Sequence, residues 1–394
     1  MATLFIQTLL TLLLLLLTPG WGSAAAAAGG GGSGERKALL RFKAAVASDP
    51  GGLLRGWSPA SPDHCVWPGV SCGGSGEVVA LNVSSSPGRR LAGGLSPAVA
   101  ALRGLRVLAL PSHAFSGQLP AAIWSLRRLL VLDLSGNRLQ GEIPATLACA
   151  GLQTLDLSYN QLNGSVPASL GALSGLRRLS LASNRLGGAI PDELGGAGCR
   201  SLQYLDLSGN LLVGGIPRSL GNCSKLEALL LSSNLLDDII PPEIGRLRNL
   251  RALDVSRNSL SGSVPAELGG CVELSALAGF RSSSFVLGTD LTSYHSFSQN
   301  NFTGAMTSLP LAVDKLGMQG SYAFLADGNN IAGQLQPDLF SKCNSSRGYV
   351  VDISNNLITG GIPVEIGSLC GSLVVLGVAG FEGELAGTST KGYG

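Results

Sequence analysis

The feature that most constrains this chain of 394 residues is a pattern that recurs six times from Leu126 onward. Each segment follows L-x-x-L-x-L-x-x-N-x-L-x-G-x-I-P, and the Asn residues of successive segments lie 23 to 26 positions apart. A period of this length is typical of proteins in which each repeat packs only on its neighbours, so repetition rather than length sets the number of domains. The repeated asparagines are Asn137, Asn160, Asn184, Asn210, Asn234 and Asn258.

The spacing inside one repeat predicts its conformation. Leu132 and Leu134 flank Asp133, so a short strand turns both leucines to one face and the aspartate to the other. The leucines fill the interior, neighbouring repeats pair their strands in parallel, and the Asn amide satisfies backbone groups that the following turn leaves unpaired. Gly141 and Pro144 then bend the chain back at a fixed point. The sequence therefore predicts an α/β solenoid.

Composition and the N-terminus exclude several classes of protein. Charged residues are 13% of the chain, the net charge is +2, and no Lys/Arg-rich block is present, so we expect no nucleic-acid partner. The apolar stretch near the start predicts a signal peptide over 1–28, followed by a Gly-rich linker over 29–34. No later window is apolar enough for a membrane span. We therefore expect a product that is secreted or lies at the extracellular face of the plasma membrane.

The L-x-G-x-I-P form resembles the plant-specific class of leucine-rich repeats. That class occurs in the ectodomains of receptor-like kinases, in receptor-like proteins and in polygalacturonase-inhibiting proteins, and this chain is most similar to the toadstool type of receptor-like kinase. The family's cap motif is matched by the segments around Leu39 and Phe42 and by the stretch from His64 to Cys72. The resemblance implies a leucine-rich-repeat superhelix with a parallel sheet on its concave face and an N-terminal cap over 35–77.

The cap motif carries two more specific predictions. Leu39, Phe42 and Val46 have helical spacing, so one apolar stripe of a helix can cover the open end of the solenoid. The resemblance also implies a disulfide between Cys65 and Cys72, in keeping with an exported chain.

Repeats are predicted over 78–380, with weaker units at both ends. His113 stands where the second upstream unit should carry its Asn, and the gap from Asn258 to Asn300 predicts an irregular insertion near 278–296. Two interpretations of that insertion stay open. In brassinosteroid-receptor relatives an island between repeats forms part of the ligand site, which would give Phe285, Tyr294 and His295 a binding role. The alternative is a disordered excursion or an imperfect gene model. The segment 381–394 is predicted to be a non-repeat tail in a chain truncated before a membrane span and kinase.

The residues needed for catalysis are not found in the sequence. His64, His113 and His295 are far apart and match no metal-binding spacing, and neither a G-x-S-x-G turn nor a kinase signature is present. We therefore predict no enzyme activity, no cofactor and no metal.

The other cysteines allow two interpretations. In the first, all six are reduced and pack as small buried apolar side chains. In the second, more specific interpretation, Cys199 and Cys223 form a disulfide between adjacent coils. These cysteines are Cys149, Cys199, Cys223, Cys271, Cys343 and Cys370. Five N-x-S/T sequons predict N-glycosylation at Asn82, Asn163, Asn222, Asn301 and Asn344.

The residues between the strand leucines are expected to form the concave surface. The resemblance implies that this surface recognises an extracellular peptide or protein ligand, with a leucine-rich-repeat co-receptor as a second partner, in signalling by a receptor-like kinase or receptor-like protein. The alternative function is a secreted inhibitor of microbial cell-wall hydrolases. The candidate contact residues are Asp133, Asp156, Tyr159, Arg178, Tyr204, Asp206, Asp254 and Arg257.

Overall fold

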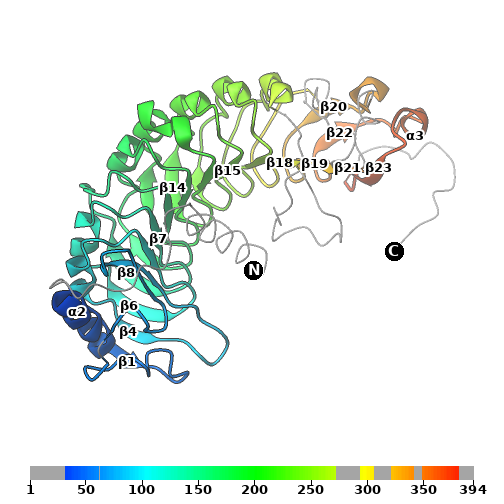
Figure 1. Ribbon diagram of the computed structural model, residues 1–394. Coiled ribbons are helices and arrows are strands. Elements are labelled where there is room, and N and C mark those ends of the chain that lie inside the picture. Colours follow the sequence, from blue (N-terminus) through cyan, green and yellow to red (C-terminus); the bar gives the residue numbers. More distant parts are fainter. Residues whose placement is uncertain (1–31, 62, 272–292, 306–320, 341–347, 381–394) are drawn as a thin grey trace. The chain divides into compact units, whose positions relative to one another are not determined.

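In the computed structural model, the residues described are 32–61, 63–271, 293–305, 321–340 and 348–380. The chain divides into two compact units, Met1–Leu211 and Leu212–Gly394, called here unit 1 and unit 2. Each unit is a stack of coils in which one strand per coil joins a largely parallel sheet (Figure 1). The predicted solenoid of leucine-rich repeats is therefore confirmed.

The main sheet of unit 1 has the strand order β2-β3-β5-β7-β9-β11-β13. Strand β2 is antiparallel to β3, and the others pair in parallel. A second sheet has the order β1-β4-β6-β8-β10, in which β8 and β10 follow the repeat residues Asn137 and Asn160. The strands are β1 (Val46–Ser48), β2 (Val70–Cys72), β3 (Val78–Asn82), β4 (Ala92–Gly94), β5 (Val107–Ala109), β6 (Ala114–Gln118), β7 (Val131–Asp133), β8 (Arg138–Glu142), β9 (Thr154–Asp156), β10 (Gln161–Asn163), β11 (Arg178–Ser180), β12 (Gly187–Ala189) and β13 (Tyr204–Asp206).

The main sheet of unit 2 has the order β15-β17-β18-β19-β21-β23, all parallel. The second strands of its coils pair as β14 with β16 and as β20 with β22. The strands are β14 (Leu211–Gly214), which begins at the last residue of unit 1, β15 (Ala228–Leu230), β16 (Leu235–Leu236), β17 (Ala252–Asp254), β18 (Ser293–Ser296), β19 (Ser321–Leu325), β20 (Ala332–Gln334), β21 (Gly348–Asp352), β22 (Leu357–Thr359) and β23 (Leu373–Gly377).

Helical turns close the coils opposite the main sheets. Most are short 3₁₀ helices that begin directly after a Pro, whose fixed backbone angle suits the start of a turn. They are η1 (Pro97–Ala101), η2 (Ala121–Ser125), η3 (Ala168–Ala172), η4 (Asp192–Gly195), η5 (Ala197–Ser201), η6 (Arg218–Asn222), η7 (Pro242–Arg246), η8 (Ala266–Gly270) and η10 (Pro337–Phe340), together with the α-helices α2 (Gly32–Ala45) and α3 (Ile366–Leu369).

Helix α2 forms the N-terminal cap, but its bounds differ from those expected. It begins at Gly32, inside the predicted linker, and it ends before Val46, which belongs to β1 and pairs with β4. A helix tolerates glycines in its first turn because the amides there have no intrahelical acceptor. Leu39 and Phe42 are buried as predicted, and the Phe42 ring lies 5.9 Å from that of Trp57.

Each repeat Asn links its own coil to the preceding coil. The Asn160 amide donates to the carbonyls of Leu157 and of Leu134 in the coil before, both at 3.0 Å, and its Oδ1 accepts from the Leu139 amide at 3.0 Å. The same arrangement recurs at Asn300, Asn329 and Asn356 in unit 2. Asn160, Asn329 and Asn356 are buried and Asn300 is half-buried, so these side chains satisfy backbone groups that are largely shielded from water.

Part of the expected insertion is ordinary repeat structure. Ser293–Ser296 form strand β18, which pairs in register with β17 and β19. Within it Tyr294 is 5% exposed and His295 is fully buried, at the position that Leu253 occupies in β17. Tyr294 and His295 therefore belong to a regular, buried strand, and a binding role for them stays a hypothesis. Phe285 and the rest of the insertion lie outside the described residues.

Candidate functional site

Four neighbouring strands of unit 1 present their non-leucine residues side by side. The outward positions of β7, β9, β11 and β13 form what we call the strand face of unit 1. One row across it contains Val131, Thr154, Arg178 and Tyr204, and the next row contains Asp133, Asp156, Ser180 and Asp206. The parallel register thus brings together five of the eight candidate contact residues.

Asp133 and Asp156 lie opposite each other and have matching local contacts. The Ser135 hydroxyl donates to Oδ1 of Asp133 at 2.7 Å, and the Ser158 hydroxyl donates to Oδ1 of Asp156 at 2.6 Å. The side chains are held by the sheet and by these bonds, and the two residues are only 8% and 9% exposed. Two carboxyl groups are therefore fixed in position before any ligand arrives.

This burial changes how the two carboxyl groups titrate. Desolvation, with a further contribution from the charge of Asp156, raises the pKa of Asp133 to about 6. Desolvation also raises the pKa of Asp156, while Arg178 opposes the shift at both positions. A cation placed between the two aspartates would favour their charged forms, so the pair can take up a positive group.

Arg178 and Tyr204 form a second, linked cluster on the same face. The Arg178 guanidinium carbon lies 3.7 Å from the centre of the Tyr204 ring, within the range of a cation–π interaction. The Tyr204 hydroxyl donates to Oδ2 of Asp206 at 3.0 Å. Burial and the neighbouring Asp206 raise the pKa of Tyr204, so the hydroxyl keeps its proton. Stacking and hydrogen bonding together restrain an Arg and a Tyr, residue types that often dominate binding energy.

The remaining candidates lie elsewhere. Tyr159 follows β9 in the turn; it is 65% exposed and has a left-handed backbone with φ of 54°. Asp254 and Arg257 belong to unit 2, where Asp254 accepts from Ser256 as its counterparts in unit 1 do. Ligand contact by all eight residues stays a prediction.

An apolar cluster that the repeat pattern does not predict lies beside the aspartates. Val131 packs with Val107 and Ala109 of β5 and with Ala80 of β3. Because Ala109 pairs with Asp133 in register, this cluster continues the strand face toward the cap. The upstream repeats lack the Asn that marks the strand, although the alternation in Val107-Leu108-Ala109 could have indicated it.

Within the described residues, one group of cysteines and a histidine lies close enough together to hold a metal ion, but its chemistry does not fit one. His64 lies beside Cys65 and Cys72, but the two sulfurs are joined in the disulfide that the family resemblance implied. Cys199, Cys223 and Cys370 are also in disulfides, whereas Cys149 and Cys271 are buried free thiols. Cys343 lies outside the described residues.

Three of the sequon asparagines are exposed, namely Asn163, Asn222 and Asn301, while Asn82 is half-buried on β3. Asn344 lies outside the described residues. Glycosylation at all five positions stays a prediction.

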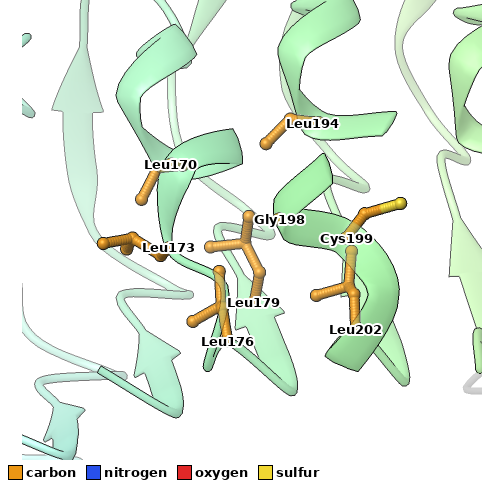
Figure 2. A pocket seen from close by; sticks show the side chains of 8 residues that line it. All are labelled: Leu170, Leu173, Leu176, Leu179, Leu194, Gly198, Cys199 and Leu202. Atoms are coloured by element: carbon orange, nitrogen blue, oxygen red, sulfur yellow. The ribbon is translucent and has the colours of Figure 1, made fainter. Parts of the chain in front are cut away.

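Figure 2 shows a small apolar gap inside unit 1 between η3 and η5. Its lining is made of leucines with Gly198 and Cys199, and a Cβ atom on Gly198 would collide with the Gly171 carbonyl. The gap results from packing between coils and offers no polar group to a ligand.

Comparison with protein families agrees with this architecture. Residues 33–73 match the leucine rich repeat N-terminal domain. Six segments match the Leucine Rich Repeat family: 128–150, 151–173, 175–197, 201–223, 225–247 and 249–271. The chain therefore contains a leucine rich repeat N-terminal domain and leucine-rich repeats.

Its homologues are receptor kinases of plants. It is 50% identical over 80 residues to the brassinosteroid LRR receptor kinase BRL3 of Oryza sativa subsp. japonica, a match that covers 19% of this chain and 6% of the relative. It is 36% identical over 95 residues to the probable LRR receptor-like serine/threonine-protein kinase RPK1 of Arabidopsis thaliana, which covers 19% and 17%. The chain thus aligns with only a small part of these relatives.

Solved structures of plant receptor ectodomains share the fold. The ectodomain of GASSHO1/SCHENGEN3 from Arabidopsis thaliana, in complex with CASPARIAN STRIP INTEGRITY FACTOR 2, has a TM-score of 0.71 and 31% identity, covering 88% of this chain and 41% of that one. Arabidopsis HAESA, in complex with the peptide hormone IDA and the co-receptor SERK1, has a TM-score of 0.60 and 27% identity, covering 89% and 62%. Within the described residues of our structure, no helix has the length and apolar character needed to cross a bilayer.

Proposed function

We propose that this chain is an extracellular recognition domain of a plant receptor-like kinase or receptor-like protein, and that the strand face of unit 1 binds a peptide or protein ligand. The observation that carries the proposal is the restrained cluster of Arg178, Tyr204 and Asp206 beside two buried carboxyl groups. The homology to receptor kinases and the ligand complexes of the structural relatives support it.

The cluster also suggests the chemistry of the ligand. Arg178 presents a planar set of donors suited to a carboxylate, and the row of aspartates suits a lysine or arginine side chain. Groups of opposite charge in adjacent rows match a peptide that carries both charges in an extended conformation. Val131 beside Asp133 adds an apolar contact at one end.

Export and partners belong to the same proposal. We propose residues 1–28 as a signal peptide, in keeping with the disulfides, which form in oxidising compartments. A leucine-rich-repeat co-receptor is the second proposed partner, supported by the HAESA complex. The comparisons give no support to an inhibitor of cell-wall hydrolases.

Peptide arrays test the proposal without a known ligand. The secreted chain is labelled and applied to an array of short synthetic peptides that differ in charge pattern. We expect the strongest binding to peptides carrying both charges, and we expect Arg178→Ala with Tyr204→Ala to lower affinity at least about tenfold. Arg177→Ala is the matched control because Arg177 is exposed and precedes the strand. Equal losses in the two proteins would contradict the proposal.

A further inference from the structure

Unit 2 exposes apolar side chains on the second strands of two adjacent coils. Val213 in β14 pairs in register with Leu235 in β16, and these residues are 42% and 52% exposed. Ile239, which follows β16, is 40% exposed. Residues paired in register on the same face of two strands lie close enough for their side chains to touch, so Val213 and Leu235 form one apolar surface.

The core does not need these side chains. Leu212 and Leu236, the neighbours of Val213 and Leu235, are fully buried and occupy the interior leucine positions. In the next coil the positions equivalent to Leu235 and Val213 are the polar residues Ser259 and Ser261. Exposed apolar residues that contribute nothing to the core indicate an interaction surface when they lie together.

The same coil also departs from the repeat in its charge. Asp237 and Asp238 are both exposed, and Asp238 stands where the pattern L-x-G-x-I-P has its Gly. The local backbone is held in place, since the Ile239 amide donates to Oδ1 of Asp238 at 2.8 Å and the Ser261 amide donates to the Asp238 carbonyl at 3.1 Å. Two exposed carboxylates therefore lie next to the apolar side chains in sequence, and that of Asp238 is held by a hydrogen bond.

We propose that Val213, Leu235, Ile239, Asp237 and Asp238 form a docking surface, called here the lateral patch, for a segment of a partner protein that combines apolar side chains with lysine or arginine. Charge complementarity selects this occupant, because two carboxylates beside an apolar surface attract a basic segment. The lateral patch lies on the second strands rather than on the strand face, so it is separate from the proposed ligand site.

A second copy of this chain fits the lateral patch less well. In a two-fold interface the same patch meets itself, which brings Asp237 and Asp238 of one copy toward those of the other. Like charges at an interface oppose association, so self-pairing through this surface is disfavoured.

Fluorescence anisotropy with a short labelled peptide that carries leucines among lysines tests the proposal on the secreted full chain. We expect Val213→Ser with Leu235→Ser to weaken binding at least about tenfold. Asp237→Asn with Asp238→Asn should weaken it and remove most of its dependence on salt. A peptide with glutamates in place of the lysines should not bind.

Two controls make the result specific. Leu357→Ser removes an equally exposed leucine, 60% accessible, from strand β22 of the same unit, and should leave binding unchanged. Glu142→Gln removes an exposed carboxylate from the second strand β8 of unit 1 and should also leave binding unchanged.

Two outcomes would overturn the proposal. One is binding by the Val213→Ser, Leu235→Ser protein within about twofold of the original, because hot-spot truncations cost more than that. The other is a concentration-dependent dimer in sedimentation velocity that Leu235→Ser abolishes, which would assign the surface to a second copy. Because all the substituted side chains are exposed, thermal melts of the variants should coincide with that of the parent chain.

Discussion

At the scale of single residues, His113 shows how one side chain can replace another of different chemistry. Its Nδ1 accepts from the Leu91 amide at 3.0 Å, and its Nε2 donates to the Val83 carbonyl at 2.9 Å. These bonds reproduce those of a repeat Asn, because one ring nitrogen accepts from a backbone amide and the other donates to a backbone carbonyl. Only the neutral imidazole protonated at Nε2 can make both bonds. Sequence analysis placed His113 at the Asn position, and the structure explains why a histidine serves there.

His113→Asn should make the protein less sensitive to acid. Desolvation, followed by the charge of Arg90, lowers the pKa of His113 below its ordinary 6.5, although the bond to Val83 and the charge of Asp49 oppose the shift. As the pH falls below 6.5, the unfolded chain takes up a proton that the folded chain resists, so stability decreases. Urea denaturation above and below pH 6.5 should show a smaller loss for His113→Asn than for the parent chain. Equal losses would mean that His113 does not contribute.

His295 is a buried polar residue at a leucine position in unit 2. Its Nδ1 shares a hydrogen bond of 2.9 Å with the Tyr322 hydroxyl, and its Nε2 has no partner among the described residues. Burial lowers the pKa of His295 to about 4. Replacing both partners by apolar residues of similar shape removes the cost of burying polar groups. Removing only one partner leaves the other polar group buried without a hydrogen bond, which lowers stability.

We therefore expect His295→Leu with Tyr322→Phe to be at least as stable as the parent chain, and Tyr322→Phe alone to lose about 1–3 kcal/mol. The advantage of the double variant should grow as the pH falls from 6.5 toward 4, the window in which the unfolded histidine is protonated and the folded one is not. Denaturant melts at several pH values measure both effects. A double variant less stable than Tyr322→Phe would contradict this account.

At the scale of elements, the Asn link is the unit that joins one coil to the next. The Asn184 amide donates to the carbonyls of Leu181 and Leu157 at 3.0 Å, and its Oδ1 accepts from the Leu162 amide at 3.0 Å. Asn160 and Asn210 also donate to these two carbonyls, so removal of Asn184 leaves one buried group, the Leu162 amide, without its side-chain partner, at a cost of about 1–3 kcal/mol.

Asn184→Ala should lower the free energy of unfolding by about 1–3 kcal/mol, since the buried Leu162 amide loses its acceptor. Hydrogen exchange should accelerate at the Leu162 amide in particular, because its acceptor is gone. Arg185→Ala is the control, since Arg185 is exposed and next in sequence. Unchanged exchange at Leu162 would refute the assignment of this bond.

The same scale explains what the sequence could and could not predict. The repeats with regular leucines were placed correctly because strand alternation, the Asn and the Gly–Pro turn all agree. The sequence pattern places strand β18 in an insertion, because His295 and Phe297 stand where the repeat has leucines. The structure shows that these two side chains can occupy the leucine positions. On the strand face, periodicity placed Arg178 and Tyr204 at outward positions, but the stacking of one on the other depends on side-chain conformation that no pattern encodes.

At the scale of the whole molecule, stability should be the sum of contributions from neighbouring coils. Asn160 and Asn184 both donate to the Leu157 carbonyl, whereas Asn356 in unit 2 shares no partner with either. Groups that share a partner couple, while distant groups do not.

Asn160→Ala and Asn356→Ala should therefore lose stability additively, to within about 0.5 kcal/mol. Asn160→Ala and Asn184→Ala together should depart from additivity by more than that, because they act on one carbonyl. Double-mutant cycles from denaturant melts measure both pairs. If Asn160 and Asn356 coupled as strongly as Asn160 and Asn184, stability would not be a sum of contributions from neighbouring coils.

The Asn links also have a direction, because each one reaches back to the coil before it and none of those described above reaches forward. A coil emerging from the ribosome thus keeps one backbone amide, such as that of Leu139, without its side-chain acceptor until the next Asn arrives. Synthesis runs in the same sense, so each newly made repeat completes its predecessor, and folding can advance from the cap in step with translation. Because the Asn links all point toward the N-terminus, the coils can pack in the order in which they are synthesised.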